Sequence, residues 1–273
     1  MPALEMSAQL FAIFSALVEE AAGIHYGAGD RELFATKVAD QAADAGYATL
    51  LDYYYRLRYD DPSREELRAL LEALVVHETY FFRELAPLAE LVRGPLANTV
   101  AKRGRARVWS AACSTGEEPL SLAMLLAEAG MLARVEIVAT DLSRAAIERA
   151  RSGVHGRRAL REPYPHALAQ RFLEPIAQGV LAPHALREAI RFDVVNLLDA
   201  AAVAALGTFD VILCRNVLIY FSDEEVARTV GRLTSALAPG GVLAVGVSES
   251  LLRYGTSLVC EERGGAFFYR RAA

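Results

Sequence analysis

Residues 107–119 read RVWSAACSTGEEP, and this stretch decides the fold. Arg107–Ala112 has the apolar pattern of a short buried strand, and Glu118-Pro119 opens a helix because proline in the first turn loses no hydrogen bond. The turn between them consists of small residues, which let a ligand approach the backbone closely. It lacks the glycine spacing of dinucleotide-binding turns and the lysine of phosphate-binding loops, and it contains no basic residue. The stretch therefore predicts a strand–turn–helix unit that binds a nucleoside-type cofactor without a phosphate.

Strands and helices continue to alternate toward the carboxyl end of the chain. Val135–Thr140 is the next apolar strand, and Ser143 is placed to cap a helix over Arg144–Arg151. Further strands are expected at 209–214, 242–247 and 266–270, with a capping box at Ser222–Glu225 and a turn at Pro239-Gly240-Gly241. This alternation predicts an α/β fold with a parallel sheet that is covered by helices on both faces.

An acidic residue, Asp141, follows the second strand and lies 25 residues after Gly116. In parallel sheets of this type, an acid at that place accepts hydrogen bonds from the ribose hydroxyls of a bound nucleoside. The alternative is that Asp141 only caps the helix that follows it. Together with the turn of small residues, the acid resembles the S-adenosylmethionine (AdoMet) site of class I methyltransferases.

The first 76 residues contain helix signals only. Apolar residues mark one helix face between Leu10 and Val18, Asp30 can cap a helix that runs through Ala45, and aromatic residues mark a helix over Leu50–Tyr59. A fourth helix has a capping box at Ser63–Glu66, followed by the apolar stripe Leu67, Leu70, Leu71, Leu74 and Val75. This segment has 6 basic and 13 acidic residues, whereas residues 77–273 have 23 basic and 21 acidic residues. An acidic helical segment therefore precedes a nearly neutral α/β segment.

The composition excludes several classes of protein. The chain of 273 residues has a net charge of −5 and 53% hydrophobic residues, which argues against a disordered chain and against a dedicated nucleic-acid binder. Its 3 cysteines lie far apart and its 5 histidines are scattered, so a disulfide scaffold, a zinc ribbon and a histidine metal site are not expected. No signal peptide or membrane-inserting segment is recognisable, and a cytoplasmic monomer is expected.

Four strings make the chain similar to one family. They are HETYFFRE at 77–84, RVWSAACSTGEEP at 107–119, ATD at 139–141 and FDVILCRNVLIYF at 209–221. In these strings, and nearly end to end, the chain resembles the CheR family of AdoMet-dependent chemotaxis-receptor glutamate O-methyltransferases.

The resemblance also implies a domain organisation. An all-helical domain would cover residues 1–76, a linker at 77–106 would contribute to the cofactor site, and residues 107–273 would form a Rossmann-like class I methyltransferase sheet. The segment 152–195, which contains four prolines and interrupts the alternation of strands and helices, would be a small inserted β-subdomain.

The resemblance further implies which residues bind AdoMet. They are His77, Thr79, Arg83, Ala111, Gly116, Glu117, Asp141, Asn196, Leu197, Arg215 and Asn216. Within this set, Glu117 would hold the methionine portion, Asp141 the ribose, and Asn196-Leu197 the adenine. His77 replaces the asparagine of well-known members, although an imidazole can also form hydrogen bonds.

The reaction implied by the resemblance requires little acid–base chemistry. The AdoMet methyl group is already activated and a glutamate side chain is ionised near neutral pH, so neither a general base nor a metal is required. Arg83 and Tyr220 are the candidates that orient the substrate carboxylate, one through a planar fork of donors and the other through its hydroxyl. The alternative is that Arg83 only bridges the linker and the core and that Tyr220 only packs.

The partner implied by the resemblance is the cytoplasmic helical bundle of a methyl-accepting chemoreceptor. Family members often face this acidic bundle with a basic second helix, but the second helix here carries Arg31 and Lys37 against four acids. Since like charges disfavour docking there, the arginine-rich stretch 144–161 becomes a candidate contact surface, with a solvated helix face as the alternative. The short loop between Phe172 and Gly179 predicts that a C-terminal receptor pentapeptide is not needed as a tether.

Two other functions stay open. One is an AdoMet methyltransferase of the same fold that acts on another protein or on a small molecule, and the acidic second helix keeps this possibility open. The other is a non-catalytic AdoMet-binding signalling module, which the intact Arg83, Asn216 and Tyr220 argue against.

Overall fold

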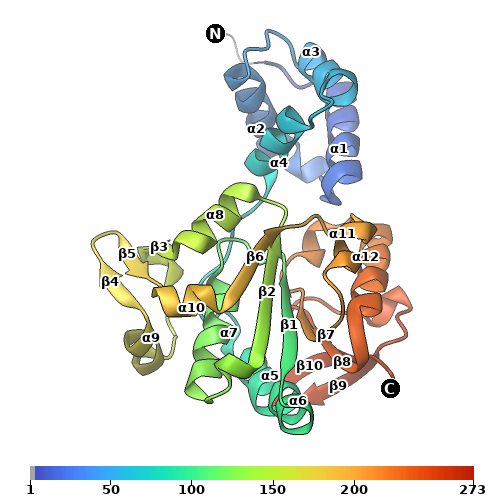
Figure 1. Ribbon diagram of the computed structural model, residues 1–273. Coiled ribbons are helices and arrows are strands. Elements are labelled where there is room, and N and C mark those ends of the chain that lie inside the picture. The colour runs from blue at the N-terminus through green and yellow to red at the C-terminus, as the bar shows by residue number, and fades with distance from the viewer. Residues whose placement is uncertain (1–3) are drawn as a thin grey trace. The chain divides into compact units, whose positions relative to one another are not determined.

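The computed structural model describes residues 4–273, which divide into two compact units (Figure 1). The first unit combines the chain up to Val76 with Tyr220–Glu225, and the second comprises His77–Ile219 and Val226–Ala273. Within the described residues, no helix is both long enough and apolar enough to cross a lipid bilayer.

The first unit is built from helices, as the sequence predicts. Its α-helices are α1 (Ala8–Ala22), α2 (Arg31–Asp44), α3 (Leu50–Tyr55) and α4 (Glu65–Leu74), with a 3-10 turn at Ala28–Asp30 and a π-helical turn at Arg56–Asp60. Each helix buries an apolar stripe, and the aromatic rings of Phe14, Phe34 and Tyr53 are fully buried between them. Burial of these stripes supplies the driving force for the helical packing.

The cap of α4 differs from the predicted capping box. Asp61 accepts the shorter hydrogen bonds of the first turn, from the backbone amides of Glu65 at 3.1 Å and Leu67 at 3.0 Å, whereas the Ser63 hydroxyl accepts only a longer one of 3.4 Å from Glu65. A carboxylate is the stronger acceptor for the free amides at a helix start, which explains why Asp61 provides the shorter bonds. Asp30 occupies the N-cap position of α2 as predicted, but its carboxylate accepts from the Gly27 amide and makes no cap bond to α2.

Removal of the Asp61 carboxylate is expected to destabilise the helical unit more than removal of the Ser63 hydroxyl. Asp61→Ala should lower the free energy of unfolding by about 1–2 kcal/mol and Ser63→Ala by less than about 0.5 kcal/mol. Burial raises the pKa of Asp61, but hydrogen bonds from Leu67, Ser63 and Glu65 outweigh it and lower the pKa overall. The stabilisation is therefore present above the ordinary aspartate pKa and is lost as the pH falls through the lowered one. Thermal unfolding followed by circular dichroism checks this, and equal losses for both variants would contradict it.

The second unit is built on a sheet of seven strands in the order β6-β2-β1-β7-β8-β10-β9. The strands are β1 (Ala106–Ala111), β2 (Val135–Asp141), β6 (Ile190–Val194), β7 (Phe209–Leu213), β8 (Leu237–Ala244), β9 (Val259–Arg263) and β10 (Ala266–Arg270). The first five strands in this order are parallel, and β10 is antiparallel to both of its neighbours. The strand order reverses between β1 and β7, and ligands of open α/β sheets bind at the carboxyl ends of strands beside such a reversal.

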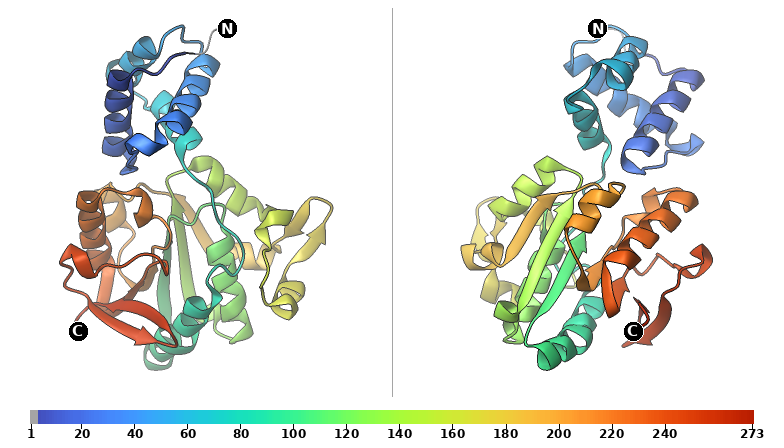
Figure 2. Two further views of the ribbon diagram at one scale, coloured as in Figure 1. Left: turned by 180° about the vertical axis from the view of Figure 1, so that it is seen from behind. Right: turned by 45° about the vertical axis from the view of Figure 1, so that its right-hand side comes forward.

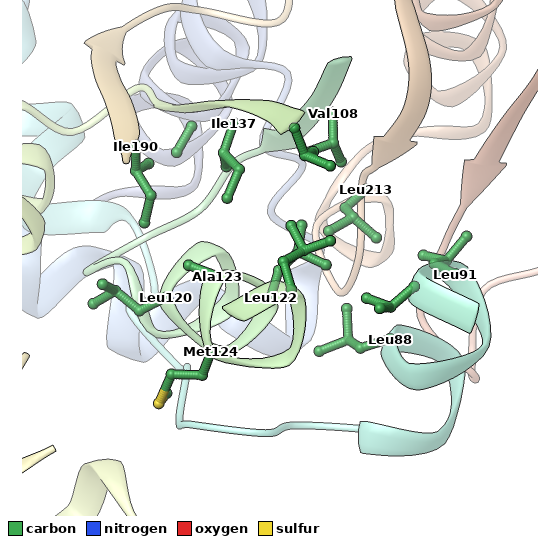
Figure 3. Close-up of a cluster of buried hydrophobic side chains, with 14 of the residues drawn as sticks. Leu88, Leu91, Val108, Leu120, Leu122, Ala123, Met124, Ile137, Ile190 and Leu213 are labelled. Atoms are coloured by element: carbon green, nitrogen blue, oxygen red, sulfur yellow. The ribbon is translucent and has the colours of Figure 1, made fainter. Parts of the chain in front are cut away.

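Helices cover both faces of this sheet, as predicted. They are α5 (Leu85–Leu91), α6 (Ala97–Arg103), α7 (Glu117–Glu128), α8 (Arg144–Ser152), α11 (Ala200–Ala205) and α12 (Asp223–Ala236), with a π-helical turn at Val92–Leu96 and 3-10 turns at Leu132–Arg134, Leu218–Tyr220 and Leu252–Tyr254. Val108 and Trp109 point to opposite faces of β1 and are both fully buried. In Figure 3, side chains of α5 and α7 gather against strand residues such as Ile137 on one of these faces.

A smaller antiparallel sheet lies in the segment 152–195. Its strands β3 (Val154–Gly156), β5 (Gly179–Leu181) and β4 (Glu174–Ile176) are accompanied by a 3-10 turn at Arg157–Ala159 and by α9 (His166–Phe172) and α10 (His184–Glu188). Figures 1 and 2 place this sheet beside the β6 edge of the large sheet. The last strand of the segment, β6, pairs with β2 and belongs to the large sheet.

The Pro239-Gly240-Gly241 sequence does not form the predicted turn. It lies inside β8, which begins at Leu237 and ends at Ala244, and the pairing with β7 shifts its register between Phe209 and Val211. A side chain at Gly241 would bring its Cβ within 2.8 Å of the Ala238 carbonyl oxygen, so this irregular stretch requires glycine.

Candidate active site

The turn from β1 to α7 has a compact backbone that excludes larger side chains. Ala112, Ser114 and Gly116 have φ angles of 58°, 51° and 94°, which lie in the left-handed region. At Gly116 a Cβ would lie 2.7 Å from the Cβ of Ala150 in α8, so a side chain at this position would also clash. The turn therefore packs closely against α8 and starts α7 directly after the carboxyl end of β1, which is the end where ligands of open α/β sheets bind.

Asp141 ties the end of β2 to this turn. Its Oδ2 accepts a hydrogen bond of 2.7 Å from the Ser114 amide, and its Oδ1 accepts one of 2.9 Å from the Ser143 amide. The helix cap itself comes from Ser143, whose hydroxyl accepts from the Ala146 amide as the sequence predicts. The structure thus brings Asp141 and the turn together, while a contact between Asp141 and ribose stays a prediction.

Glu117 begins α7 and is a buried, ionised carboxylate. Its Oε1 lies 2.9 Å from Nδ1 of His155, and its Oε2 accepts from the Thr115 hydroxyl at 2.7 Å. Burial alone would raise the pKa of Glu117, but the hydrogen bond and charge of His155, followed by the Thr115 bond, lower it overall. His155 comes from β3 of the small sheet and was not among the predicted site residues.

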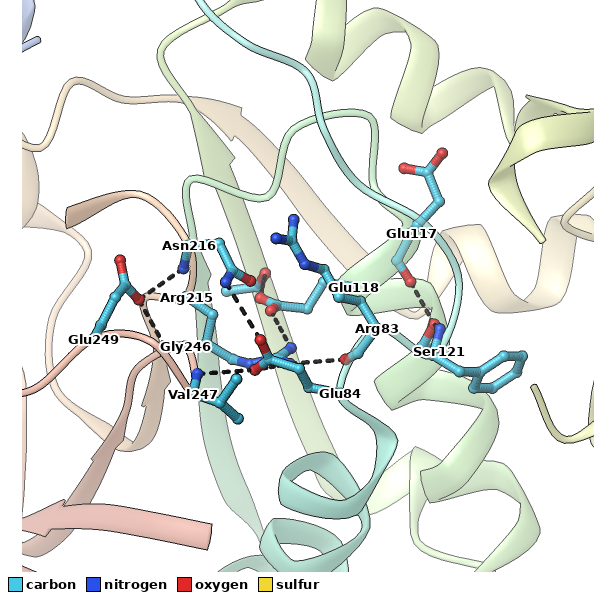
Figure 4. A network of polar contacts seen from close by, with 12 residues as sticks. Arg83, Glu84, Glu117, Glu118, Ser121, Arg215, Asn216, Gly246, Val247 and Glu249 are labelled. Carbon is cyan, nitrogen blue, oxygen red and sulfur yellow. Dashed lines mark hydrogen bonds and ion pairs between the residues drawn. The ribbon is translucent and has the colours of Figure 1, made fainter. Parts of the chain in front are cut away.

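The linker motif is fixed against the same end of α7. The Phe82 amide donates to the Ser121 hydroxyl at 2.8 Å. That hydroxyl donates to the Glu117 carbonyl at 2.6 Å, as Figure 4 shows. Arg83 follows directly, and its guanidinium donates to the Glu78 carbonyl at 2.6 Å. Consecutive linker residues therefore lie beside the β1–α7 turn.

Arg215, which follows β7, forms a buried charge cluster. Its guanidinium bonds Glu118 at 2.7 Å, Glu84 at 2.9 Å and the Arg83 carbonyl at 2.7 Å, and its side chain is only 1% exposed. Burial lowers the pKa of Arg215, but the two carboxylates outweigh this effect and raise it. In Figure 4, Glu118 points into this cluster, whereas Glu117 points away from it. The cluster joins the linker, α7 and the end of β7.

Asn216 is held beside this cluster by the half-buried carboxylate of Glu249. Its φ angle is 60°, its amide donates to Glu249 at 2.7 Å, and its side chain donates to Glu84 at 3.3 Å. The same Glu249 oxygen accepts from the Gly246 amide at 2.7 Å, as Figure 4 shows. Burial raises the pKa of Glu249 more than these backbone hydrogen bonds lower it. Neither Glu84 nor Glu249 was among the predicted site residues.

The other predicted site residues have the following places. Leu197 is buried after β6, and the neighbouring Val195 amide donates to the Asp141 carbonyl at 3.0 Å. His77 has its Nδ1 3.4 Å from the Ser114 hydroxyl. Ala111 is buried at the end of β1, Thr79 is half-buried in the linker, and the side chain of Asn196 accepts from the Leu198 amide at 2.9 Å. Tyr220 belongs to the unit that contains the N-terminal helices, so its predicted role beside Arg83 stays a prediction.

The charges and the hydrogen-bond acceptors of this site fit AdoMet. The carboxylates of Glu117 and Asp141 lie at adjacent strand ends, and residues 111–117 contain no basic side chain that would attract a phosphate. A cofactor with a positively charged sulfonium and ammonium group suits such an acidic site.

The fold and this acidic site define a class I, AdoMet-dependent methyltransferase. Residues 77–262 match the family model described as "CheR methyltransferase, SAM binding domain", and the chain belongs to the CheR methyltransferase family.

Several curated proteins are similar to the chain over most of its length. A "Chemotaxis protein methyltransferase" of Vibrio parahaemolyticus is 34% identical over 257 residues, which cover 92% of this chain and 92% of that protein. "Chemotaxis protein methyltransferase 2" of Vibrio cholerae is 38% identical over 74% of this chain and 71% of its own. A "Probable biofilm formation methyltransferase WspC" of Pseudomonas putida is 37% identical over 76% of this chain and 49% of its own.

Proposed function

We propose that the protein transfers the methyl group of AdoMet to glutamate side-chain carboxylates in the cytoplasmic domain of a chemoreceptor. The products would be a glutamate methyl ester and S-adenosylhomocysteine. The observation that carries the proposal is the similarity over 92% of the chain to a chemotaxis protein methyltransferase.

In this proposal the protein binds AdoMet and orients the acceptor carboxylate, and it transfers no proton. AdoMet, when bound, supplies an activated methyl group, and the acceptor glutamate is ionised near neutral pH. Glu117 and Asp141 would bind the charged and the ribose portions of the cofactor, while Arg83 would orient the acceptor carboxylate with its fork of donors. Alignment of this kind can lower a barrier by about 7–11 kcal/mol in favourable cases.

Loss of the proposed orienting groups should slow methyl transfer in a folded protein. Arg83→Ala should lower kcat about 100-fold and Tyr220→Phe about tenfold, because each variant removes a donor to the acceptor carboxylate. Initial rates with labelled AdoMet measure the effect. Arg93→Ala and Tyr59→Phe are matched controls at exposed sites, and they should keep the original rate. Full turnover by both test variants would show that Arg83 and Tyr220 only pack.

The acceptor is identified by the stability of the transferred label. The protein is incubated with methyl-labelled AdoMet and purified chemoreceptor cytoplasmic fragments, and the product is then treated with alkali. Label that alkali releases from glutamates supports the proposal, since methyl esters hydrolyse in base. Label that survives alkali indicates a different acceptor atom, and AdoMet binding without turnover indicates a non-catalytic module.

A second candidate function is methylation of a protein outside chemotaxis. It is favoured by the charge of α2, where Glu32, Asp40 and Asp44 are exposed. Both basic side chains of this helix instead donate to backbone carbonyls, Arg31 to Met6 at 2.8 Å and Lys37 to Leu74 at 3.4 Å. Similarity to the protein named for biofilm formation agrees with an acceptor of this kind. Transfer to fragments of other signalling receptors, with none to chemoreceptors, would favour it.

We further propose that no receptor pentapeptide is required as a tether. β4 and β5 are joined by Ala177 and Gln178 alone, so the connection offers little surface for a peptide. The arginine-rich stretch 144–161 stays the candidate surface for an acidic partner. Calorimetry with a C-terminal receptor pentapeptide should give no binding, and a micromolar affinity would overturn this part of the proposal.

A further inference from the structure

The buried pair of Glu117 and His155 connects two parts of the second unit. Glu117 starts α7 at the proposed AdoMet site, and His155 is the central residue of β3 in the small sheet. The side chain of Glu117 is 5% exposed and that of His155 is 0% exposed. Oε1 of Glu117 lies 2.9 Å from Nδ1 of His155. No water screens such a pair, so the interaction is stronger than one at the surface.

The hydrogen of this bond lies on His155. Glu117 is ionised and can only accept, so Nδ1 of the imidazole must donate. The other ring nitrogen, Nε2, is buried without a hydrogen-bond partner among residues 4–273. Within the described residues, the His155 ring therefore makes one polar contact, and that contact is with Glu117, the residue proposed to bind AdoMet.

The linker also contacts the His155 ring. Phe81 contacts His155 edge to face, with ring centroids 4.8 Å apart, and the Phe81 amide donates to the Ala159 carbonyl at 2.7 Å. Ala159 follows β3 in the small sheet's segment. The linker, α7 and the small sheet thus meet at His155.

We propose that His155 is a positioning residue for AdoMet binding, which makes the small sheet part of the cofactor site. The inference rests on the proposed contact between Glu117 and AdoMet. His155 holds the Glu117 carboxylate in place, so AdoMet binding and the order of β3 are linked. Because such linkage is reciprocal, bound AdoMet stabilises the small sheet.

Calorimetric titration with AdoMet tests the positioning role. His155→Ala should weaken AdoMet binding about tenfold, and His155→Asn, whose amide nitrogen can replace Nδ1 as the donor, should restore it to within about threefold. His166→Ala is the matched control, because His166 also pairs with a glutamate, Glu162, but both side chains are exposed. Its affinity should be unchanged. Wild-type affinity in the alanine variant, or an asparagine variant no better than alanine, would overturn the inference.

The pH dependence of binding separates positioning from packing. His155 lowers the pKa of Glu117, so the carboxylate of the alanine variant should protonate at a higher pH than in the wild type. The other titratable groups nearby are Cys113, whose thiol burial keeps protonated, Glu118, which faces Arg215, and Asp141, which is the same in the wild type and the variant. AdoMet affinity in His155→Ala should therefore fall with acidification earlier than in the wild type. Parallel pH profiles would contradict a role through Glu117.

Hydrogen exchange tests the linkage between AdoMet binding and the order of β3. It uses the wild-type protein, so the test holds even if a variant fails to fold. AdoMet should slow exchange of the β3 and β5 amides in the wild type, while amides of the distant β9–β10 hairpin should not change. Unchanged exchange in β3 would overturn the linkage.

Glu117→Gln distinguishes this inference from the proposed function. If it weakens AdoMet binding and His155→Ala does not, only the positioning role fails. If Glu117→Gln binds AdoMet as the wild type does, the assigned role of Glu117 fails, and the inference fails with it.

Discussion

Arg215→Ala is expected to lower the free energy of unfolding by about 3–5 kcal/mol. The substitution removes the counter-ion of Glu84 and Glu118, whose side chains are only 15% and 14% exposed. Two like charges would then lie close together with little access to water, which is far more costly than the loss of a surface ion pair. Thermal and denaturant unfolding of the whole chain measure the loss.

Controls separate charge from packing in this cluster. Arg215→Met keeps most of the volume and should lose nearly as much stability as Arg215→Ala. Adding Glu84→Gln and Glu118→Gln to Arg215→Met should recover part of the loss, because no unpaired charge is left. Arg171→Ala is the surface control, since Arg171 pairs with Glu128 at 61% and 48% exposure and such pairs contribute about 0–1 kcal/mol. Similar losses for Arg171→Ala and Arg215→Ala would contradict the argument.

Asp141→Ala is expected to weaken AdoMet binding at least about 100-fold. The variant loses two hydrogen bonds from backbone amides to a charged group, each worth about 1.5–3 kcal/mol. One of them fixes the Ser114 amide, so the turn at the start of α7 would lose its shape as well as a proposed ribose ligand. Calorimetric titration measures the affinity.

The control for Asp141 lies at the other end of the same strand. Glu136 is exposed on β2 and pairs with Arg107, so Glu136→Ala should leave AdoMet affinity unchanged. Asp141→Asn tests the charge, since an amide oxygen still accepts but carries no charge, and its affinity should lie between those of the wild type and the alanine variant. Wild-type affinity in Asp141→Ala would show that the residue only shapes the helix start.

The sequence predicts strands well where apolar runs are uninterrupted. β1, β2 and β7 lie within one residue of their predicted bounds at each end. β6 was not predicted as a separate strand because Arg191 and Asp193 interrupt its apolar pattern, and pairing with β2 makes it a strand. β9 was missed because an edge strand can carry charges such as Glu262.

The sequence predicts the site residues that follow strand ends. It does not predict those that belong to the site through an ion pair or a hydrogen bond with a distant segment. The sequence places Gly116, Glu117 and Asp141 at the carboxyl ends of neighbouring strands, which is where the structure has them. The partners of the charged groups come from distant segments: His155 is 38 residues from Glu117, and Glu84 is 131 residues from Arg215. No local pattern encodes such pairings, because they exist only after the linker, α7 and the small sheet have packed.

The position of β10 has a consequence for synthesis of the protein. This strand lies inside the sheet, between β8 and β9, and pairs with β9 through a Gly264-Gly265 turn whose φ angles of 56° and 76° suit a tight hairpin. Until the ribosome has released this hairpin, β8 is an open edge that can pair with other nascent chains. The hairpin can form by itself within about 1–10 μs and then dock as a unit. A ribosome that stalls before Ala266 would therefore leave a nearly complete domain with an aggregation-prone edge.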